Sequence, residues 1–255
     1  MNITTLGAHN CESQNTRLTT LLIDDIIAID AGALTSSLTF PAQKQLKAIL
    51  LTHQHYDHIK DIPTIAFNFA MAWTTLNIYS TLPVYQALSL ILGNKLYPNF
   101  LEFPQENPSL KFNLIEPYQA TQIEGYGVLA LPVNHSTPTV GYQVTSPEGK
   151  TVFYTGDTGP GLEDCWQRIS PQLLITEVSA PNRFQELYQR RGHFTPNLLQ
   201  EELVSFRELK GYLPQVVIVH MNPELEEEIK AELATLAHSL GHPITPAHEG
   251  MQITL

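Results

Sequence analysis

The chain has 255 residues, is 43% hydrophobic and carries a formal net charge of −11 at pH 7. This length can bury a large core, in one domain or in two small ones. With 25 Asp and Glu against 14 Lys and Arg, the charge argues against a long nucleic acid as partner, since such proteins neutralise phosphates with a basic face. A small anion that meets a bound metal ion remains compatible with it.

No apolar run is long enough to span a membrane. The first residues, MNITTLGAHN, lack the basic flank and long apolar stretch of a signal peptide. We therefore expect a cytoplasmic protein that makes no membrane contact. Cys11 and Cys165 are the only cysteines, which predicts two free thiols and leaves any metal site to imidazole and carboxylate ligands.

Eight strands are predicted in chain order from short β-branched and apolar runs, at residues 18–23, 26–30, 48–52, 128–133, 140–144, 151–155, 173–176 and 216–220. Helices are expected at 62–73, 84–92, 196–209 and 223–240. The last two follow Thr195-Pro196 and Asn222-Pro223, where a capping residue precedes proline at the first helical position. Clustered strands with helices between the clusters predict two sheets packed face to face with helices outside. No linker or internal repeat divides the chain, so residues 1–255 are expected to form one domain.

The stretch LLTHQHYDHIKDI, residues 50–62, holds three histidines and an aspartate within six positions: His53, His55, Asp57 and His58. The chain has only ten histidines. At that frequency such a spacing would occur by chance in roughly one chain in a thousand of this length. The stretch is therefore the first candidate for a metal site.

Potential ligands or proton carriers also follow the predicted strands. Each one alone can be a turn cap or a structural histidine, but strand ends at one rim of packed sheets converge in space. The residues at these positions are Asp30, His53, His55, His135, Asp157, Glu177 and His220.

Alternate side chains of an extended turn point the same way, so His53 and His55 can bind one ion while Asp57 and His58 face a second. Asp157 can bridge both ions through its two oxygens. The expected ligand sets are His53, His55, His135 and Asp157 for one ion, and Asp57, His58, His220 and Asp157 for the other. Imidazole and carboxylate suit zinc, manganese or iron, and a position left open for water is typical of a catalytic site.

The pattern H-x-H-x-D-H, a later His, G-D-T and a final strand-end His resembles the metallo-β-lactamase superfamily of dinuclear hydrolases. The resemblance implies an α/β fold, a four-layer αββα sandwich with mixed sheets over nearly the whole chain. VNHSTPTVGYQV, YTGDTGP, TEVSAPNRFQEL, GHFTPNLLQEEL and VHMNP look like the class II cyclic-nucleotide phosphodiesterases and their bacterial relatives. Many relatives have a glycine-rich loop after the first strand, where this chain has GAHNCESQNTR at residues 7–17.

On this reading, two divalent ions, zinc first and manganese or iron as alternatives, share a hydroxide that attacks phosphorus in line. A bound cation can lower the pKa of water from 15.7 to about 7. A helix beginning near Ile59 is expected to aim its amide groups at the same pocket. The expected catalytic residues are Asp57, His193 and Glu177.

His193 is the expected acid for the leaving alkoxide, with Glu177 holding its ring. The tRNA 3′-end-processing nucleases of the superfamily use a similar pair. The alternative is that His193 only caps the following helix. Asp30 and Thr52 are expected to orient a histidine ligand or to cap a turn.

His9, Asn10 and Arg17 are expected either to contact the substrate or to hydrogen-bond their own loop. Asn182 and Arg183 are expected to hold phosphate or base, or else to lie on a loop surface. The aromatic side chains of residues 61–117 are expected to lie in the core or in a homodimer interface, with one or two of them stacking on a base.

The leading hypothesis is hydrolysis of a 3′,5′-cyclic nucleotide, cAMP or cGMP, or of a similar small phosphodiester. A tRNA 3′-end-processing endoribonuclease needs the same ligands, but the acidic charge argues against it. Hydrolysis of a thioester, lactone or β-lactam is a third reading, which the GHFT segment argues against. A metal-binding scaffold without activity is the non-enzymatic alternative.

Overall fold

Two seven-stranded sheets form the centre of the computed structural model, which describes residues 1–95 and 97–255. The first sheet has the order β14-β1-β2-β3-β4-β5-β6. Its strands are β1 Asn2–Gly7, β2 Thr20–Ile23, β3 Ile27–Ile29, β4 Ala48–Leu50, β5 Leu76–Ser80, β6 Leu110–Leu114 and β14 Gln252–Thr254. The second has the order β13-β12-β11-β10-β9-β8-β7. Its strands are β7 Ala120–Ile123, β8 Tyr126–Val133, β9 Thr139–Thr145, β10 Thr151–Tyr154, β11 Leu173–Glu177, β12 Gln215–Val219 and β13 Ile244–Pro246.

Both sheets are mixed. The pairs β14–β1, β1–β2 and β2–β3 are antiparallel, and β3 to β6 run parallel. In the second sheet β7 to β10 are antiparallel, and β10 to β13 are parallel. The parallel strands need crossovers, which the helices provide.

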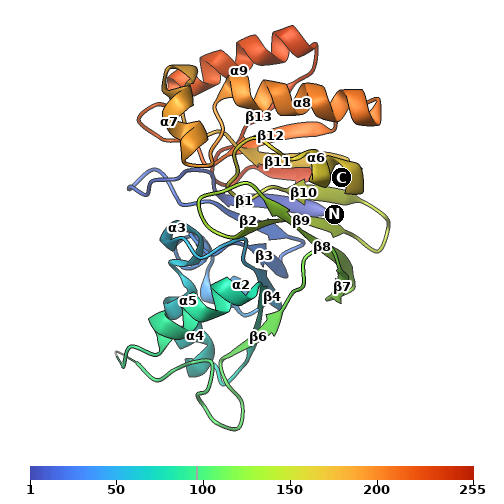
Figure 1. The fold of residues 1–255 in the computed structure, drawn as a ribbon. Coiled ribbons are helices and arrows are strands. Elements are labelled where there is room, and N and C mark those ends of the chain that lie inside the picture. The colour runs from blue at the N-terminus through green and yellow to red at the C-terminus, as the bar shows by residue number, and fades with distance from the viewer. Residues whose placement is uncertain (96) are drawn as a thin grey trace.

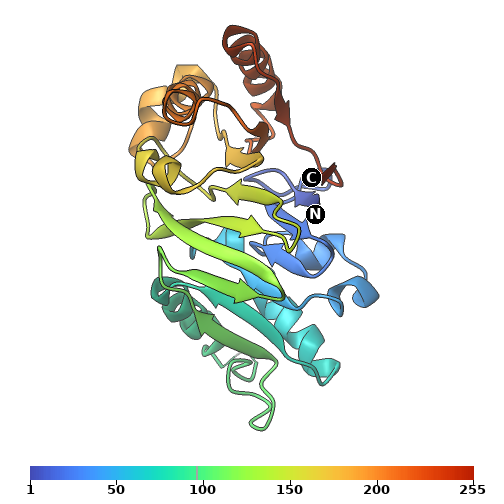
Figure 2. The same cartoon turned by 90° about the vertical axis from the view of Figure 1, so that its right-hand side faces the viewer.

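Helices cover the outer face of each sheet, as Figures 1 and 2 show from two directions. The first half of the chain contains α1 Leu34–Ser37, α2 Phe40–Gln43, α3 Tyr56–Ile59, α4 Ile62–Met71 and α5 Leu82–Leu92. The second half contains α6 Glu163–Arg168, α7 Gln185–Arg190, α8 Pro196–Lys210 and α9 Glu226–Leu240, with a 3-10 turn η1 at Asn182–Phe184. Every described helix is too short or too polar to cross a membrane.

Three apolar layers separate the four layers of structure. Along β4, Ala48 and Leu50 pack between the sheets while Ile49 packs against the helices of the first half. Along β10, Tyr154 faces the inter-sheet core and Phe153 packs with Trp166 of α6. Successive side chains of a strand point to opposite faces, so a strand covered on both sides needs a continuous apolar run. The predicted αββα sandwich with mixed sheets is confirmed.

Some predicted boundaries were wrong. The helix expected at residue 223 begins at Glu226, because Asn222 Oδ1 accepts from the Glu224 amide at 2.9 Å and holds a turn first. Thr195 does precede α8, but its side chain makes no capping hydrogen bond. The one-turn helix α3 starts at Tyr56, earlier than the predicted start near Ile59.

The sequence analysis missed six strands: β1, β5, β6, β7, β13 and β14. Most of them are short or carry polar residues, as in LKFNL and ATQI, so their apolar pattern is weak. Among the aromatic residues of 61–117, Phe69 and Phe100 are buried as predicted. Trp73 and Tyr97, by contrast, are 80% and 62% exposed. Cys11 and Cys165 are free thiols, as predicted.

Candidate metal centre

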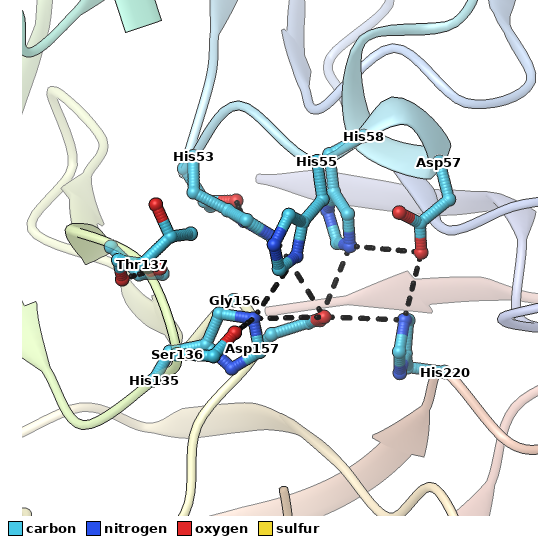
Figure 3. Close-up of polar contacts among 12 residues, drawn as sticks. His53, His55, Asp57, His58, His135, Ser136, Thr137, Gly156, Asp157 and His220 are labelled. Carbon is cyan, nitrogen blue, oxygen red and sulfur yellow. Dashed lines mark hydrogen bonds and ion pairs between the residues drawn. The ribbon is translucent and has the colours of Figure 1, made fainter. Parts of the chain in front are cut away.

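Seven histidine and aspartate side chains converge at one rim of the sandwich (Figure 3). The loop after β4 and the short helix α3 provide four of them, and loops after β8, β10 and β12 provide one each. The residues are His53, His55, Asp57, His58, His135, Asp157 and His220. The structure therefore brings together every ligand that the sequence predicted, from positions spread over most of the chain.

The first ligand set is His53, His55, His135 and Asp157, whose ligand atoms all lie within 4.8 Å of one another. Nε2 of His135 lies 3.1 Å from Nδ1 of His55 and 3.9 Å from Oδ2 of Asp157. Nε2 of His53 lies 3.8 Å from the same oxygen. Ring nitrogens this close to one another and to a carboxylate oxygen have the spacing of ligands around a single cation.

The second set is Asp57, His58, Asp157 and His220. Nε2 of His58 lies 3.2 Å from Oδ1 of Asp157. Nε2 of His220 lies 3.2 Å from Oδ2 of Asp57 and 3.4 Å from Oδ2 of Asp157. Asp157 thus belongs to both sets, which is the geometry of a bridging carboxylate.

Three polar atoms at the centre have no hydrogen-bond partner although they are buried: Nε2 of His53, Nε2 of His58 and Oδ1 of Asp157. Leaving such atoms unsatisfied costs about 1–3 kcal/mol each. Their orientation toward common points and their nitrogen and carboxylate chemistry fit divalent cations such as zinc, manganese or iron.

Asp30 holds His58 directly, and His53 through Thr52, in each case by the Nδ1 atom of the histidine. Its Oδ2 lies 2.7 Å from Nδ1 of His58, and its Oδ1 accepts from the Thr52 amide at 2.8 Å. The Thr52 hydroxyl contacts both Asp30 and Nδ1 of His53 at 3.0 Å. Asp30 adopts φ +61°, a strained conformation for a non-glycine residue that is often found at functional sites. Asp30 and Thr52 therefore hold the rings of His58 and His53, the contact expected of residues that orient a histidine ligand.

The remaining contacts come from the second sheet. Nδ1 of His135 lies 2.8 Å from the carbonyl oxygen of Gly192, and Nδ1 of His220 lies 2.8 Å from Oγ of Ser179. Each of these contacts leaves Nε2 of the histidine directed at the centre of the site. Ser179 was not predicted as a site residue, although it lies within TEVSAP, part of a stretch that resembles the class II cyclic-nucleotide phosphodiesterases.

The protonation states of three histidines suit ligands, whereas the burial of His58 is outweighed by Asp157, Asp30 and Asp57, which raise the pKa of that histidine above its ordinary value. Burial lowers the pKa of His53, His55 and His135, and neighbouring histidines lower it further for His53 and His55. These rings are therefore neutral at pH 7. Burial would raise the pKa of Asp57, but His58 and His220 outweigh it and hold that pKa below its ordinary value. Asp57 is therefore ionised.

Glu177 and His193 form a pair beside the ligands. Oε1 of Glu177 lies 2.7 Å from Nδ1 of His193, and Oε2 accepts from the Ser179 hydroxyl at 2.6 Å. Burial lowers the pKa of His193, but the charge and hydrogen bond of Glu177 outweigh it and raise the pKa to about 9. The His193 ring stacks on that of His220 at 5.6 Å, so the pair lies directly against the second ligand set.

A cavity of about 310 Å³ opens onto the centre. Besides ligands and His193, its lining includes Asn10, which was an expected substrate contact, and five residues that were not predicted as site residues: Cys11, Ser179, Tyr188, Arg191 and Asn222.

Of the predicted substrate contacts, His9, Arg17, Asn182 and Arg183 do not line this cavity. His9 is buried between Glu249 and Glu226, at 2.7 Å and 3.3 Å. Arg183 pairs with Glu228 at 2.9 Å on the surface. The side chain of Asn182 accepts from the Asn197 amide at 2.8 Å. His9, Asn182 and Arg183 therefore make contacts within the protein, and of the residues next to them in sequence only Asn10 lines the cavity.

An αββα sandwich with two histidine and carboxylate sets at one rim is the architecture of a metallo-β-lactamase-type protein. Residues 19–221 match the family model described as Beta-lactamase superfamily domain, and the chain belongs to this superfamily.

Among curated proteins, the chain is 29% identical over 199 residues to a UPF0173 metal-dependent hydrolase of Cupriavidus necator. That match covers 72% of this chain and 63% of the relative, less than two thirds of its length. Among solved structures, unliganded yeast PDE1 superposes with a TM-score of 0.83 at 16% identity, over 100% of this chain and 99% of the other. The structure of human tRNase Z, short form, superposes with a TM-score of 0.69 at 17% identity, over 100% of this chain and 99% of the other. At these identities the structural likeness shows the fold alone.

Proposed function

We propose that this protein is a dinuclear metal-dependent hydrolase of small phosphodiesters, and that 3′,5′-cyclic nucleotides are the substrates to test first. The observation that carries the proposal is the sharing of Asp157 between two ligand sets, with the Glu177–His193 pair against the second set. The name of the Cupriavidus necator relative supports metal-dependent hydrolysis, and the stretches that resemble class II cyclic-nucleotide phosphodiesterases support the substrate class.

Bound divalent ions would supply water of lowered pKa and would neutralise charge on a phosphoryl group. The chain contributes the placement of the ligands. Asp30, Thr52, Ser179 and the Gly192 carbonyl each hold a histidine by one nitrogen, so the other nitrogen keeps its direction. Zinc is the first metal to test, with manganese and iron as alternatives.

His193 would hold the proton that a leaving alkoxide needs. Its Nδ1 is engaged by Glu177, which leaves Nε2 as the atom that carries a proton into the cavity. With a pKa of about 9, the ring is protonated at neutral pH. Glu177 also accepts from the Thr158 amide at 2.8 Å, so the carboxylate is fixed by the backbone as well as by its histidine.

The size of the cavity and the charge of the chain favour a small substrate. About 310 Å³ lies within the range of small-molecule sites. A net charge of −11 disfavours a tRNA, whose phosphates would need a basic surface.

The test measures turnover by protein that has been loaded in turn with zinc, manganese and iron and whose metal content has been measured. The substrates are cyclic AMP, cyclic GMP and bis(p-nitrophenyl) phosphate, with a pre-tRNA, a thioester, a lactone and a β-lactam as comparisons. We expect cleavage of a phosphodiester that Asp157→Ala abolishes. Cleavage of only the carbonyl substrates, or of none, would overturn the proposal.

A further inference from the structure

We infer that Arg191 is the anion-recognition residue of the metal cavity and that its guanidinium binds the phosphate group of the substrate. This inference rests on the proposed function and identifies how the cavity selects its ligand. It also replaces Arg183, which pairs with Glu228 and does not line the cavity.

Arg191 lies on a turn that is fixed to the metal centre. Directly after α7, its amide donates to the Tyr188 carbonyl at 3.0 Å, and the His193 amide donates to the same oxygen at 3.0 Å. Gly192 between them has φ +75°, and a Cβ there would lie 2.7 Å from Cα of His135. The Gly192 carbonyl in turn lies 2.8 Å from Nδ1 of that histidine. The turn is therefore packed against a ligand of the first set, and only glycine fits at its centre.

Arg191 also differs from its neighbours in its pairing. Arg183 contacts Glu228 at 2.9 Å, and Arg190 contacts Glu186 at 3.5 Å. The guanidinium of Arg191 is exposed and has no carboxylate partner among the described residues. In a chain with 25 acidic residues, an arginine left without a carboxylate next to a cavity is free to bind an anion.

The lining of the cavity favours the same ligand. Arg191 is the one lysine or arginine among the residues that the structure places in this lining. The carboxylates there, Asp57 and Asp157, belong to the ligand sets, so bound cations would neutralise them. A planar guanidinium matches two oxygens of a phosphate, a geometry that lysine cannot reproduce.

Arg191 and His193 flank one glycine and line one cavity. A phosphoryl group within reach of the His193 ring is then within the span of an arginine side chain. The turn would hold the phosphate through one residue and supply the proton through the other. In Figure 1, α7, which leads into this turn, lies on the same side of the sandwich as α3, which carries Asp57 and His58.

The test compares Arg191→Ala and Arg191→Lys with Arg190→Ala, a matched control whose arginine is adjacent but lines a different pocket. Two readouts are needed: KM and kcat for the cleaved phosphodiester, and the affinity of the metal-loaded protein for inorganic phosphate by calorimetry. We expect Arg191→Ala to raise KM and weaken phosphate binding by about tenfold or more, because a hydrogen bond to a charged group is lost. Metal content should change by less than about twofold, and Arg191→Lys should restore part of the loss.

Unchanged phosphate affinity in Arg191→Ala would overturn the inference. Equal losses in Arg190→Ala and Arg191→Ala would overturn it too, since they would show a general charge effect. If the wild-type protein cleaves no phosphodiester, the proposed function fails. The phosphate titration still tests Arg191 in that case, because it requires no turnover.

Discussion

The metal centre and the His9 cluster (His9, Glu226 and Glu249) are two buried arrangements of histidine and carboxylate in the same protein. In the His9 cluster both ring nitrogens are engaged, Nδ1 with Glu249 and Nε2 with Glu226. In the metal centre, His53 and His58 each use one nitrogen and leave Nε2 buried without a partner.

The protonation of His9 and of His53 differs accordingly, although His58, which faces Asp157, Asp30 and Asp57, also has a raised pKa. Burial lowers the pKa of His9, but Glu249 and Glu226 outweigh it, so the pKa is raised and the pair acts as an ion pair. Burial lowers the pKa of His53 and keeps that ring neutral, the form that binds a metal. A histidine among carboxylates is therefore not by itself a metal site. The distinguishing feature is an unused nitrogen directed at a carboxylate shared with other histidines.

The largest effect is expected from Asp157→Ala, which removes the residue common to both ligand sets. Metal content measured by mass spectrometry should fall to near zero, and turnover should be lost with it. The control is His9→Ala, which should keep its full metal content. A variant without Asp157 that still binds two ions would show that the two sets do not depend on a bridge.

His193→Ala should lower kcat by about 10²- to 10⁴-fold, the usual contribution of a positioned acid. Its metal content should stay at the wild-type level. The ligand atoms of Asp157, Glu177, His193 and His220 also lie within 4.8 Å of one another, so the second measurement is needed. Loss of metal from this variant would make His193 a ligand and remove its assignment as the acid.

The pH dependence of turnover follows from the same residue. An acid must be protonated to act, and the pKa of His193 is raised to about 9. Activity should therefore persist through neutral pH and fall as the pH rises through about 9. The residual activity of His193→Ala should lack this alkaline limb. If the limb persists in the variant, it belongs to another group.

Ser179→Ala should weaken metal binding in the second set by about 10- to 100-fold, as expected when a residue that orients a ligand is removed. Its hydroxyl lies 2.8 Å from Nδ1 of His220 and 2.6 Å from Oε2 of Glu177. Ser179→Thr, which keeps the hydroxyl, should recover most of the affinity. Metal titration by calorimetry measures both. Equal affinity in Ser179→Ala and wild type would reduce this serine to a packing residue.

The smallest effect is expected from His9→Ala, which should cost about 1–3 kcal/mol of unfolding free energy and leave the metal centre intact. The pKa of His9 is raised in the folded protein. The ion pair therefore stabilises the fold fully below the ordinary pKa of 6.5, and this stabilisation is lost as the pH rises through the pKa of His9 in the folded state. The pKa of Glu249 is lowered from 4.5 to about 2. Its charge therefore stabilises the fold fully above pH 4.5, and this stabilisation is lost as the pH falls through about 2. Urea unfolding should thus show the largest difference from wild type between pH 4.5 and 6.5. A difference that does not vary with pH would mean that packing, and not the ion pair, stabilises this cluster.

The sequence by itself predicted the layered fold and the histidine and aspartate residues that the structure brings together at one rim. His53, His55, Asp57 and His58 lie in one turn after a strand, so local geometry fixes their relation. The more distant ligands could be predicted because they share a rule: each follows an apolar strand, and strand ends meet at one rim.

Only the tertiary structure decided which other polar residues join the centre. His9 finds its partners 217 and 240 residues away along the chain, and nothing in its own neighbourhood separates it from a cavity residue. Arg190 pairs locally with Glu186 four residues earlier, but Arg183 pairs with Glu228, 45 residues away, and no carboxylate reaches Arg191 among the described residues. Strand-end ligands follow a local pattern that repeats, whereas the pairing of a surface charge depends on long-range packing, which leaves no periodic signal in the sequence.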